Sequence, residues 1–456
     1  MSKVLVANRG EIARRIFRTC RTLGLGTVAV YSEADTGLLH VAEADQARLI
    51  GPPRPQESYL VIERILEAAH ETGADAVHPG YGFLSENARF AEAIESSGLT
   101  WIGPTPETIG AMGDKQRARE IAVAVRVAVV PGSRRFEHDD PSGLDGAAEV
   151  LGFPLLVKAS AGGGGIGMRR VDDMRSLRDV ARATQSMAAK AFGDDSIFLE
   201  RFIPKARHVE IQVFGFGDGN AVHLFERDCS LQRRFQKVIE ESPAPGIPED
   251  IHKRMAEAAV NICRATRYRG AGTVEFVVDA HTFEFYFLEM NTRIQVEHPV
   301  TEMITGRDLV AMQIELAAGT LTSLEQDAIN ARGHAIECRL YAENPAKMFM
   351  PSPGKLERYR PPAEPGDLRV ETGYREHDMV TPFYDPLLAK VIAWAPTRDA
   401  ARQRMVSALA KFEVSGIRTN REFLIACLRD EAFAAGNVST GFIDQRREQL
   451  LAAVDQ

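Results

Sequence analysis

Two glutamates in neighbouring apolar segments are the residues of this chain best suited to chemistry. Segments 273–278 and 285–291 are rich in β-branched and aromatic residues and flank a short polar turn, so they predict a β-hairpin. Its register places Glu275 nearly opposite Glu289, with Asn291 on the same face as Glu289. Two such carboxylates repel, and burying them is costly unless a cation lies between them. Oxygen ligands of this kind suit Mg²⁺ shared with nucleotide phosphates.

Polar side chains continue beyond the hairpin at alternate positions. They are Glu289, Asn291, Arg293, Gln295 and Glu297. If the backbone stays extended, they form a single polar face. The guanidinium of Arg293, beside Gln295, suits a small planar anion such as bicarbonate, and Glu297 is then placed to remove a proton. An exposed edge strand would show the same alternation, so this interpretation depends on the hairpin acids.

A glycine run forms a second candidate site. Four consecutive glycines at 162–165 follow a predicted strand, 155–158, that ends in Lys158. Their backbone N–H groups can close over phosphate oxygens, and the lysine adds positive charge. A flexible linker is the alternative, but the run lies between two strand-like segments, so a phosphate-covering loop is favoured. Lys237, in a segment dense in charge, is a further candidate anion contact, although such segments are often salt-bridged surface loops.

Composition narrows the classes of function. The chain has 456 residues and a formal net charge of −8, which argues against nucleic acid as the main partner. No apolar run approaches the roughly 18–20 residues of a membrane-spanning helix, and the N-terminus has no secretory signal, so we expect no membrane partner. Five scattered cysteines without metal-binding spacing indicate a reducing, cytoplasmic location.

The elements that must position these residues predict a multi-domain α/β and α+β protein. The order of strand 4–7, helix 12–23 and strand 27–31 predicts a parallel, doubly wound sheet. A smaller α+β unit begins after residue 131, and antiparallel strands follow from 197 to 291. Further predicted helices are 59–72, 114–123, 176–192, 251–266 and 398–412. Further predicted strands are 334–341, 354–359 and 387–394.

From about Lys3 to Asp444 the chain resembles biotin carboxylase, of the ATP-grasp superfamily. The resemblance lies in the segments NRGEIARRI, HPGYGFLSEN, KASAGGGGIGM, ARHVEIQV, ERDCSLQRRFQKVIEESPAPG, GTVEF and FLEMNTRIQVEHPVTE, of which the last two are highly specific. It implies a Rossmann-like N-terminal domain (1–114), an ATP-grasp domain (115–318) with a mobile glycine-rich lid at about 131–203, and a C-terminal biotin carboxylase domain (332–444).

The resemblance also implies roles for individual residues. ATP would contact Lys115, Lys158, Gly163, Gly164, Gly165, Met168, Glu200, His208, Gln232, Glu275 and Glu289. Mg²⁺ or Mn²⁺ would be held by Glu275, Glu289 and Asn291. Bicarbonate and biotin would contact Lys237, Arg293, Gln295, Val296, Arg339 and Tyr81. The catalytic residues would be Glu297, Arg293, Arg339 and Lys237: Glu297 would deprotonate bicarbonate, which attacks ATP to give carboxyphosphate, and Arg339 would stabilise the enolate form of biotin.

The sequence gives weaker indications of the partner proteins and of the molecule that finally accepts the carboxyl group. The chain contains no AMKM-like biotinylation motif, so we expect a biotin carboxyl carrier protein and a carboxyltransferase on separate chains, and the resemblance implies a homodimer. An acetyl-CoA carboxylase of fatty acid biosynthesis is the expected system, with urea, a lactam or another acyl-CoA as alternative acceptors. Ile166 lies where the family usually has Lys or Arg, and Phe235 lies where many members have His. These two differences leave a non-enzymatic regulatory homologue as an alternative. A carboxylate–amine ligase of the same superfamily is a further alternative. It would need neither the segment from Arg293 to Glu297 nor Arg339, so it is less favoured.

Overall fold

The computed structural model describes residues 1–137, 142–160, 167–192, 194–234 and 236–453. A five-stranded parallel sheet forms the N-terminal part, in the order β3-β2-β1-β4-β5. The strands are β1 (Lys3–Val6), β2 (Gly26–Ser32), β3 (Gln46–Gly51), β4 (Ala76–His78) and β5 (Thr100–Trp101). The helices include α1 (Gly10–Thr22), α3 (Ile62–Thr72), α4 (Ala88–Ser96) and α5 (Pro106–Gly113). Fully buried aliphatic positions in β1, β2 and α1 provide the core, as the apolar pattern predicted.

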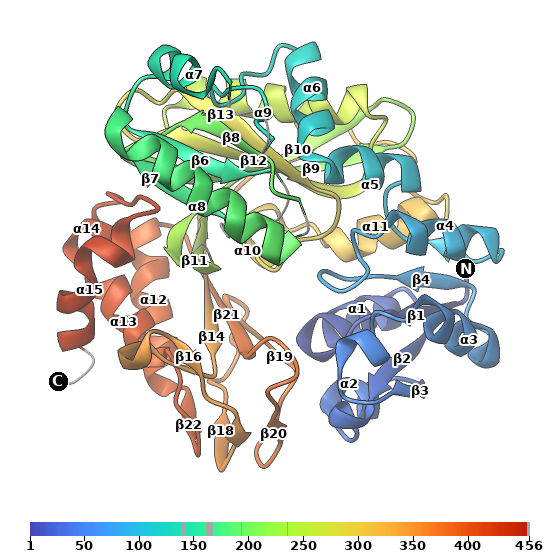
Figure 1. Cartoon of the computed structure of the whole chain (residues 1–456). Helices are drawn as coiled ribbons and strands as arrows, with labels where there is room; N and C mark the ends of the chain where they lie inside the picture. The colour runs from blue at the N-terminus through green and yellow to red at the C-terminus, as the bar shows by residue number, and fades with distance from the viewer. Residues whose placement is uncertain (138–141, 161–166, 193, 235, 454–456) are drawn as a thin grey trace.

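A sheet of eight strands crosses the rest of the molecule in the order β13-β12-β9-β10-β11-β14-β21-β19 (Figure 1). Its first five members are β9 (Ala206–Phe216), β10 (Ala221–Arg233), β11 (Gln236–Ser242), β12 (Arg269–Asp279) and β13 (Phe285–Asn291). The C-terminal members are β14 (His334–Tyr341), β19 (Leu368–Thr372) and β21 (Leu387–Ala395). Antiparallel pairing of β11 with β14 makes the sheet continuous between the central and C-terminal parts. Residues on β11 and β14 are therefore neighbours although they are far apart in the sequence.

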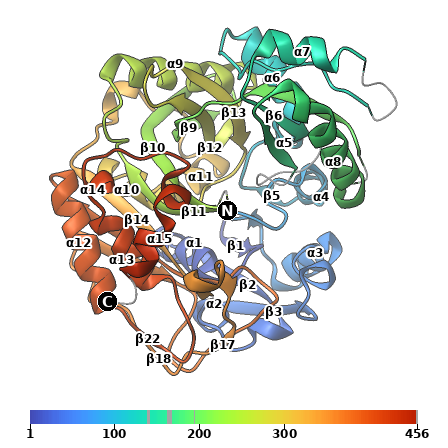
Figure 2. The same cartoon turned by 60° about the vertical axis from the view of Figure 1, so that its left-hand side comes forward.

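A small three-stranded sheet does not pair with either of these two, and in Figure 2 its strand β6 lies beside β13 of the large sheet. It consists of β6 (Leu155–Ala159), β7 (Met168–Val171) and β8 (Ile197–Arg201), with α7 (Leu144–Leu151) and α8 (Met174–Phe192). Leu155, Val157, Leu177 and Leu199 belong to a separate hydrophobic cluster in this unit. The unit therefore has a hydrophobic core of its own.

Other helices cover the large sheet. They are α6 (Lys115–Ala124), α9 (Glu249–Ala265), α10 (His298–Thr305), α11 (Leu309–Ala317), α12 (Arg398–Lys411), α13 (Arg421–Arg429) and α15 (Phe442–Ala452). None of the helices in the described part of the chain combines the length and apolar character needed to cross a bilayer.

One predicted strand, 354–359, is wrong in its extent. It is divided into β17 (Gly354–Lys355) and β18 (Arg358–Arg360), which pair with β20 (Met379–Val380) and β22 (Glu413–Ser415). The backbone changes partner between them, because Leu356 donates to the Asp378 carbonyl and Glu357 to the Ser415 carbonyl. The local apolar pattern does not contain this change of partner.

A buried ionic network joins the three parts of the fold. Arg15 of α1 lies 2.7 Å from Glu302 of α10 and 2.7 Å from Asp308. Glu302 also lies 2.7 Å from Arg369 of β19. Arg15 is almost fully buried, so its charge depends on these carboxylates.

We therefore predict that Arg15→Met lowers the free energy of unfolding by about 3 kcal/mol, because it leaves buried carboxylates without their cation. Urea-induced unfolding measures this change. Lys253→Met removes the exposed Lys253–Glu249 pair and serves as the control, with no measurable change expected. Equal effects of the two substitutions would contradict the structural importance of the network.

Candidate functional site

A row of three carboxylates crosses neighbouring strands of the large sheet. Glu210 of β9 pairs with Glu275 of β12, and Glu275 pairs with Glu289 of β13. The predicted pairing of Glu275 with Glu289 is thus confirmed. The sequence reasoning missed Glu210, although alternation of His208, Glu210 and Gln212 along a strand was available as a signal. Directly opposed residues are separated by about 4.5–5.5 Å between Cβ atoms, so this row concentrates negative charge.

Lys237 of β11 contacts two acids of this row, Glu210 and Glu275, and a third acid, Glu297, from outside it. Its Nζ is 2.7 Å from Oε2 of Glu210, 2.9 Å from Oε1 of Glu275 and 2.7 Å from Oε1 of Glu297. Three carboxylates match the three protons of an ammonium group. Burial opposes the charge, but the surrounding acidic groups raise the pKa of Lys237 well above its usual range. Lys237 is therefore a permanent cation that allows these acids to approach one another.

The two hairpin acids have different environments, which corrects the expectation that both are enclosed by apolar strands. Glu275 is 6% exposed, lies 2.9 Å from Nε2 of His208, and accepts a 3.0 Å hydrogen bond from Asn291. Although its burial has the opposite effect, Lys237 and His208 lower the pKa of Glu275. Glu289 is exposed, and the charge of Glu275, with partial burial, raises the pKa of Glu289. The need for a further cation is therefore greatest beside Glu289.

The predicted extended face from 289 to 297 is wrong. The chain bends after Asn291, and Glu297 has φ −84° and ψ 10° immediately before α10. Pro299 in the first turn of that helix favours this early start. Arg293 donates 2.8 Å to Gln295 and 3.1 Å to Asn291, so the bend itself brings three of the predicted residues together.

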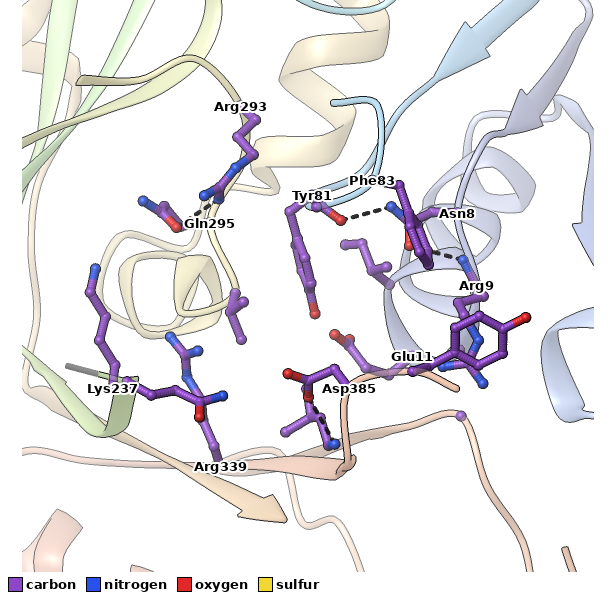
Figure 3. Close-up of a pocket in the computed structure, with 18 of the residues that line it drawn as sticks. Asn8, Arg9, Glu11, Tyr81, Phe83, Lys237, Arg293, Gln295, Arg339 and Asp385 are labelled. Carbon is purple, nitrogen blue, oxygen red and sulfur yellow. Dashed lines mark hydrogen bonds between the residues drawn. The ribbon is translucent and has the colours of Figure 1, made fainter. Parts of the chain in front are cut away.

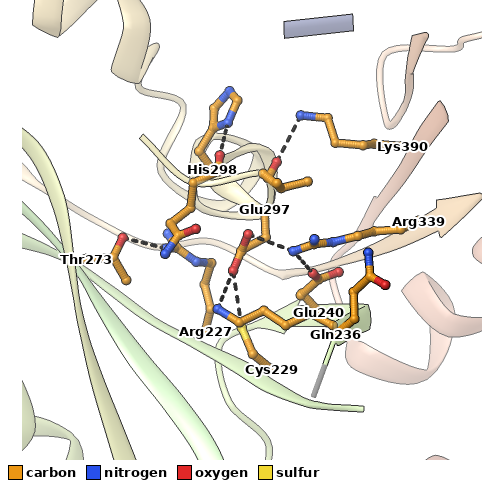
Figure 4. Close-up of polar contacts among 12 residues, drawn as sticks. Arg227, Cys229, Gln236, Glu240, Thr273, Glu297, His298, Arg339 and Lys390 are labelled. Carbon is orange, nitrogen blue, oxygen red and sulfur yellow. Dashed lines mark hydrogen bonds and ion pairs between the residues drawn. The ribbon is translucent and has the colours of Figure 1, made fainter. Parts of the chain in front are cut away.

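Glu297 lies on the other side of the bend and is fully buried. Its Oε2 accepts a 2.9 Å hydrogen bond from Arg339 of β14 (Figure 4). Its Oε1 accepts a 2.7 Å hydrogen bond from Lys237. Arg339 is also paired with Glu240 of β11. Burial would raise the pKa of Glu297, but Lys237 and Arg339 hold it well below its usual range. Glu297 is thus ionised, as a proton acceptor must be, while both of its oxygens are engaged by cations.

Lys237 and Arg339, the two cations that contact Glu297, line a cavity of about 620 Å³ (Figure 3). Its lining includes ten of the predicted site residues, namely Tyr81, His208, Lys237, Glu275, Glu289, Asn291, Arg293, Gln295, Val296 and Arg339. The cavity continues past Tyr81 to Arg9, Glu11, Phe383 and Tyr384, none of which the sequence reasoning identified. These come from the N-terminal and C-terminal parts, and only the tertiary fold brings them to one cavity.

Of the other predicted nucleotide residues, those that the structure describes do not line this cavity. Nζ of Lys158 on β6 lies 2.7 Å from Glu200 on β8, and Gln232 lies 2.7 Å from Nδ1 of His208. Burial lowers the pKa of Lys115, although the charge of Glu289 opposes this. Met168 begins β7. The predictions that concern Gly163, Gly164, Gly165, Ile166 and Phe235 lie outside the described residues.

Three protein-family models together match most of the chain. Residues 1–109 match the N-terminal domain of biotin carboxylase, 114–325 the ATP-binding domain of the carbamoyl-phosphate synthase L chain, and 337–445 the C-terminal domain of biotin carboxylase. Biotin carboxylase 1 of Bacillus subtilis is 48% identical over 444 residues, which cover 97% of this chain and 98% of that protein. The chain belongs to the biotin carboxylase family. Members of this family are ATP-grasp ligases that form a C–N bond.

Solved structures of biotin carboxylases share the fold. The biotin carboxylase domain of 2-oxoglutarate carboxylase from Hydrogenobacter thermophilus, a dimer in complex with MgADP, ADP and bicarbonate, has a TM-score of 0.92 and 44% identity, with 98% of each chain covered. Biotin carboxylase from Campylobacter jejuni has a TM-score of 0.92 and 41% identity, covering 97% of this chain and 98% of that one.

Longer relatives also match. The alpha chain of mitochondrial methylcrotonoyl-CoA carboxylase from Oryza sativa subsp. japonica is 48% identical over all of this chain. The chain spans 62% of that relative, or about three fifths of its length.

We predict that Glu297→Gln preserves ATP binding but lowers bicarbonate-dependent ATP turnover by about 100-fold, because a carboxamide cannot accept the proton of bicarbonate. Steady-state phosphate release and a nucleotide-binding titration measure the two effects separately. Turnover equal to that of the unmodified chain would exclude Glu297 as the base.

The raised pKa of Glu289 predicts a pH effect on divalent cation binding. A carboxyl group with a raised pKa takes up its proton at a higher pH than an ordinary glutamate, so affinity for Mn²⁺ should begin to fall earlier as the pH is lowered. Titration calorimetry between pH 8 and pH 5 follows this loss. Glu289→Gln should bind Mn²⁺ more weakly at pH 8 and show a smaller dependence on pH. Identical pH profiles would exclude Glu289 as a ligand.

Proposed function

We propose that this chain uses MgATP and bicarbonate to carboxylate biotin attached to a carrier protein. The observation that carries the proposal is the contact of one buried carboxylate, Glu297, with two cations, Lys237 and Arg339, at the edge of a cavity that also contains the hairpin acids. This arrangement combines a proton acceptor, anion-binding groups and metal ligands in one place.

Glu275, Glu289 and Asn291 are the proposed ligands of Mg²⁺ or Mn²⁺. Their oxygen atoms suit a hard divalent cation, and exposed Glu289 lines the cavity. The ion would neutralise charge on the ATP phosphates. Lys115, Lys158, Met168, Glu200, His208 and Gln232, with the glycines at 163–165, are the proposed ATP contacts. Lys158 and Glu200, two of these proposed contacts, form an ion pair across β6 and β8 of the small sheet.

Arg293, Gln295, Lys237 and the Val296 backbone are the proposed bicarbonate contacts. Arg293 is oriented by Gln295 and by Glu86, whose Oε2 lies 2.8 Å from its Nε. When bicarbonate takes over hydrogen bonds from Lys237 and Arg339, these cations stabilise the Glu297 carboxylate less, so its pKa rises and it becomes a stronger base. Substrate binding would thus activate the acceptor of the proton that bicarbonate loses.

Tyr81 and Arg339 are the proposed contacts of the biotin ring. Both line the cavity, and Arg339 carries positive charge beside Glu297. A guanidinium in this position can stabilise the oxygen that becomes negative when the ureido group loses its proton. Phosphate released from carboxyphosphate would accept that proton.

The partners are proposed from the relatives. We infer a biotin carboxyl carrier protein, a carboxyltransferase and a second copy of this chain as partners, in a cytoplasmic complex whose reducing surroundings suit five buried free cysteines. The proposed acceptor is an acyl-CoA, because six matching relatives at 47–50% identity are alpha chains of methylcrotonoyl-CoA carboxylase. Acetyl-CoA and pyruvate are the other acceptors to test, pyruvate because a pyruvate carboxylase component from Methanothermobacter thermautotrophicus is 48% identical.

We predict that ATP hydrolysis by the purified chain requires both bicarbonate and biotin, since carboxyphosphate forms from bicarbonate and its carboxyl group is transferred to biotin. Phosphate release is measured with each substrate omitted in turn. Turnover that needs neither would indicate a carboxylate–amine ligase, and absence of turnover under all conditions would indicate a regulatory homologue. With the co-purifying carrier and transferase, transfer of labelled carboxyl to methylcrotonoyl-CoA, acetyl-CoA or pyruvate identifies the acceptor.

A further inference from the structure

Two successive peptide carbonyls in the bend before α10 are held by buried side chains. The Gln295 carbonyl oxygen lies 2.7 Å from Nδ1 of His298, and the Val296 carbonyl oxygen accepts a 2.9 Å hydrogen bond from Nζ of Lys390 (Figure 4). His298 and Lys390 are both 0% exposed, so neither side chain is in contact with solvent.

Holding the carbonyls also sets the direction of the next amide groups. In a trans peptide the N–H points opposite to the C=O, so the amides of Val296 and Glu297 point away from His298 and Lys390. Val296 lines the cavity. Within the part of the chain that the structure describes, neither amide donates a hydrogen bond to a protein acceptor. Consecutive N–H groups without protein acceptors form a binding place for an anion.

To hold this carbonyl, His298 needs a proton on Nδ1. A carbonyl oxygen only accepts hydrogen bonds, so Nδ1 must be the donor. Burial, together with the charge of Lys390, lowers the pKa of His298 well below its usual range, which keeps the ring neutral. The other nitrogen, Nε2, has no hydrogen-bond partner among the described residues and lies 3.9 Å from Glu302. Among the described residues, the only hydrogen bond of the ring is therefore the one from Nδ1 to the Gln295 carbonyl.

Lys390 is fixed by the two outer parts of the molecule. Its Nζ lies 3.2 Å from Glu11 of α1 and 3.1 Å from Glu371 of β19. Burial opposes the charge, but these carboxylates raise the pKa of Lys390. The contact with Val296 therefore joins the bend to both the N-terminal sheet and the C-terminal strands.

We propose that His298 and Lys390 are positioning residues that aim the amides of Val296 and Glu297 at bicarbonate in the cavity. The inference rests on the proposed function. It adds the Glu297 amide to the Val296 backbone contact proposed above, and it assigns the direction of both amides to two side chains that do not touch the substrate. Because bicarbonate alone uses these donors, their loss should alter the KM for bicarbonate and leave that for ATP unchanged.

Three substitutions of His298 test the proposal, two by residues with a side-chain carboxamide and one by leucine. In His298→Asn the side-chain N–H takes the place of Nδ1, so the KM for bicarbonate should stay within about threefold of the unmodified value. In His298→Gln the donor lies one bond farther out, and His298→Leu has no donor. Both should raise that KM by about tenfold, the effect of losing one hydrogen bond to an anion, with the KM for ATP unchanged.

The outcomes separate this proposal from a structural role and from the proposed function itself. A bicarbonate KM unchanged in both Gln and Leu variants would overturn the proposal, as would equal losses in all three variants that include the KM for ATP. Thermal unfolding identifies variants that fail to fold, and the Gln variant, which stays polar, covers failure of the Leu variant. An unmodified chain without bicarbonate-dependent turnover would refute the proposed function instead.

Discussion

The contact of one ammonium group, Lys237, with three carboxylates is the interaction on which the rest of the site depends. Glu210, Glu275 and Glu297 are almost fully buried, and without a shared cation their mutual repulsion would prevent them from meeting. Arg227, which is 0% exposed and lies 2.6 Å from Glu210, contributes a second buried cation. Glu289 is left at the open end of the row with a raised pKa, and this remaining negative charge favours a divalent ion there.

The continuous sheet explains how this charge balance is built. Strands β9, β12 and β13 supply the row of acids, β11 supplies Lys237, and β14 supplies Arg339. Backbone hydrogen bonds set the spacing of these side chains, so the site needs little rearrangement to keep its geometry. The bend before α10 then places Glu297 beside Lys237, and the buried contacts of Lys390 attach the bend to the outer parts of the molecule.

The sequence predicted local elements well and their long-range partners poorly. Alternating apolar residues were sufficient for the hairpin of Glu275 and Glu289 and for the strand 334–341, because a strand needs only its own pattern to be recognised. The same alternation gave a wrong prediction beyond Asn291, where the chain bends and helix α10 begins at His298. Glu11 and Lys390 meet across almost the whole chain, and no local pattern encodes that distance.

A crystal structure with Mg²⁺ and a non-hydrolysable ATP analogue tests the central claim most directly. We expect electron density for the ion within about 2.0–2.1 Å of carboxylate oxygens of Glu289 or Glu275, and a triphosphate that the ion bridges. We also expect Lys237 to remain among Glu210, Glu275 and Glu297. An ion and triphosphate bound away from this row, with Glu289 directed to bulk solvent, would contradict the proposed role of these acids.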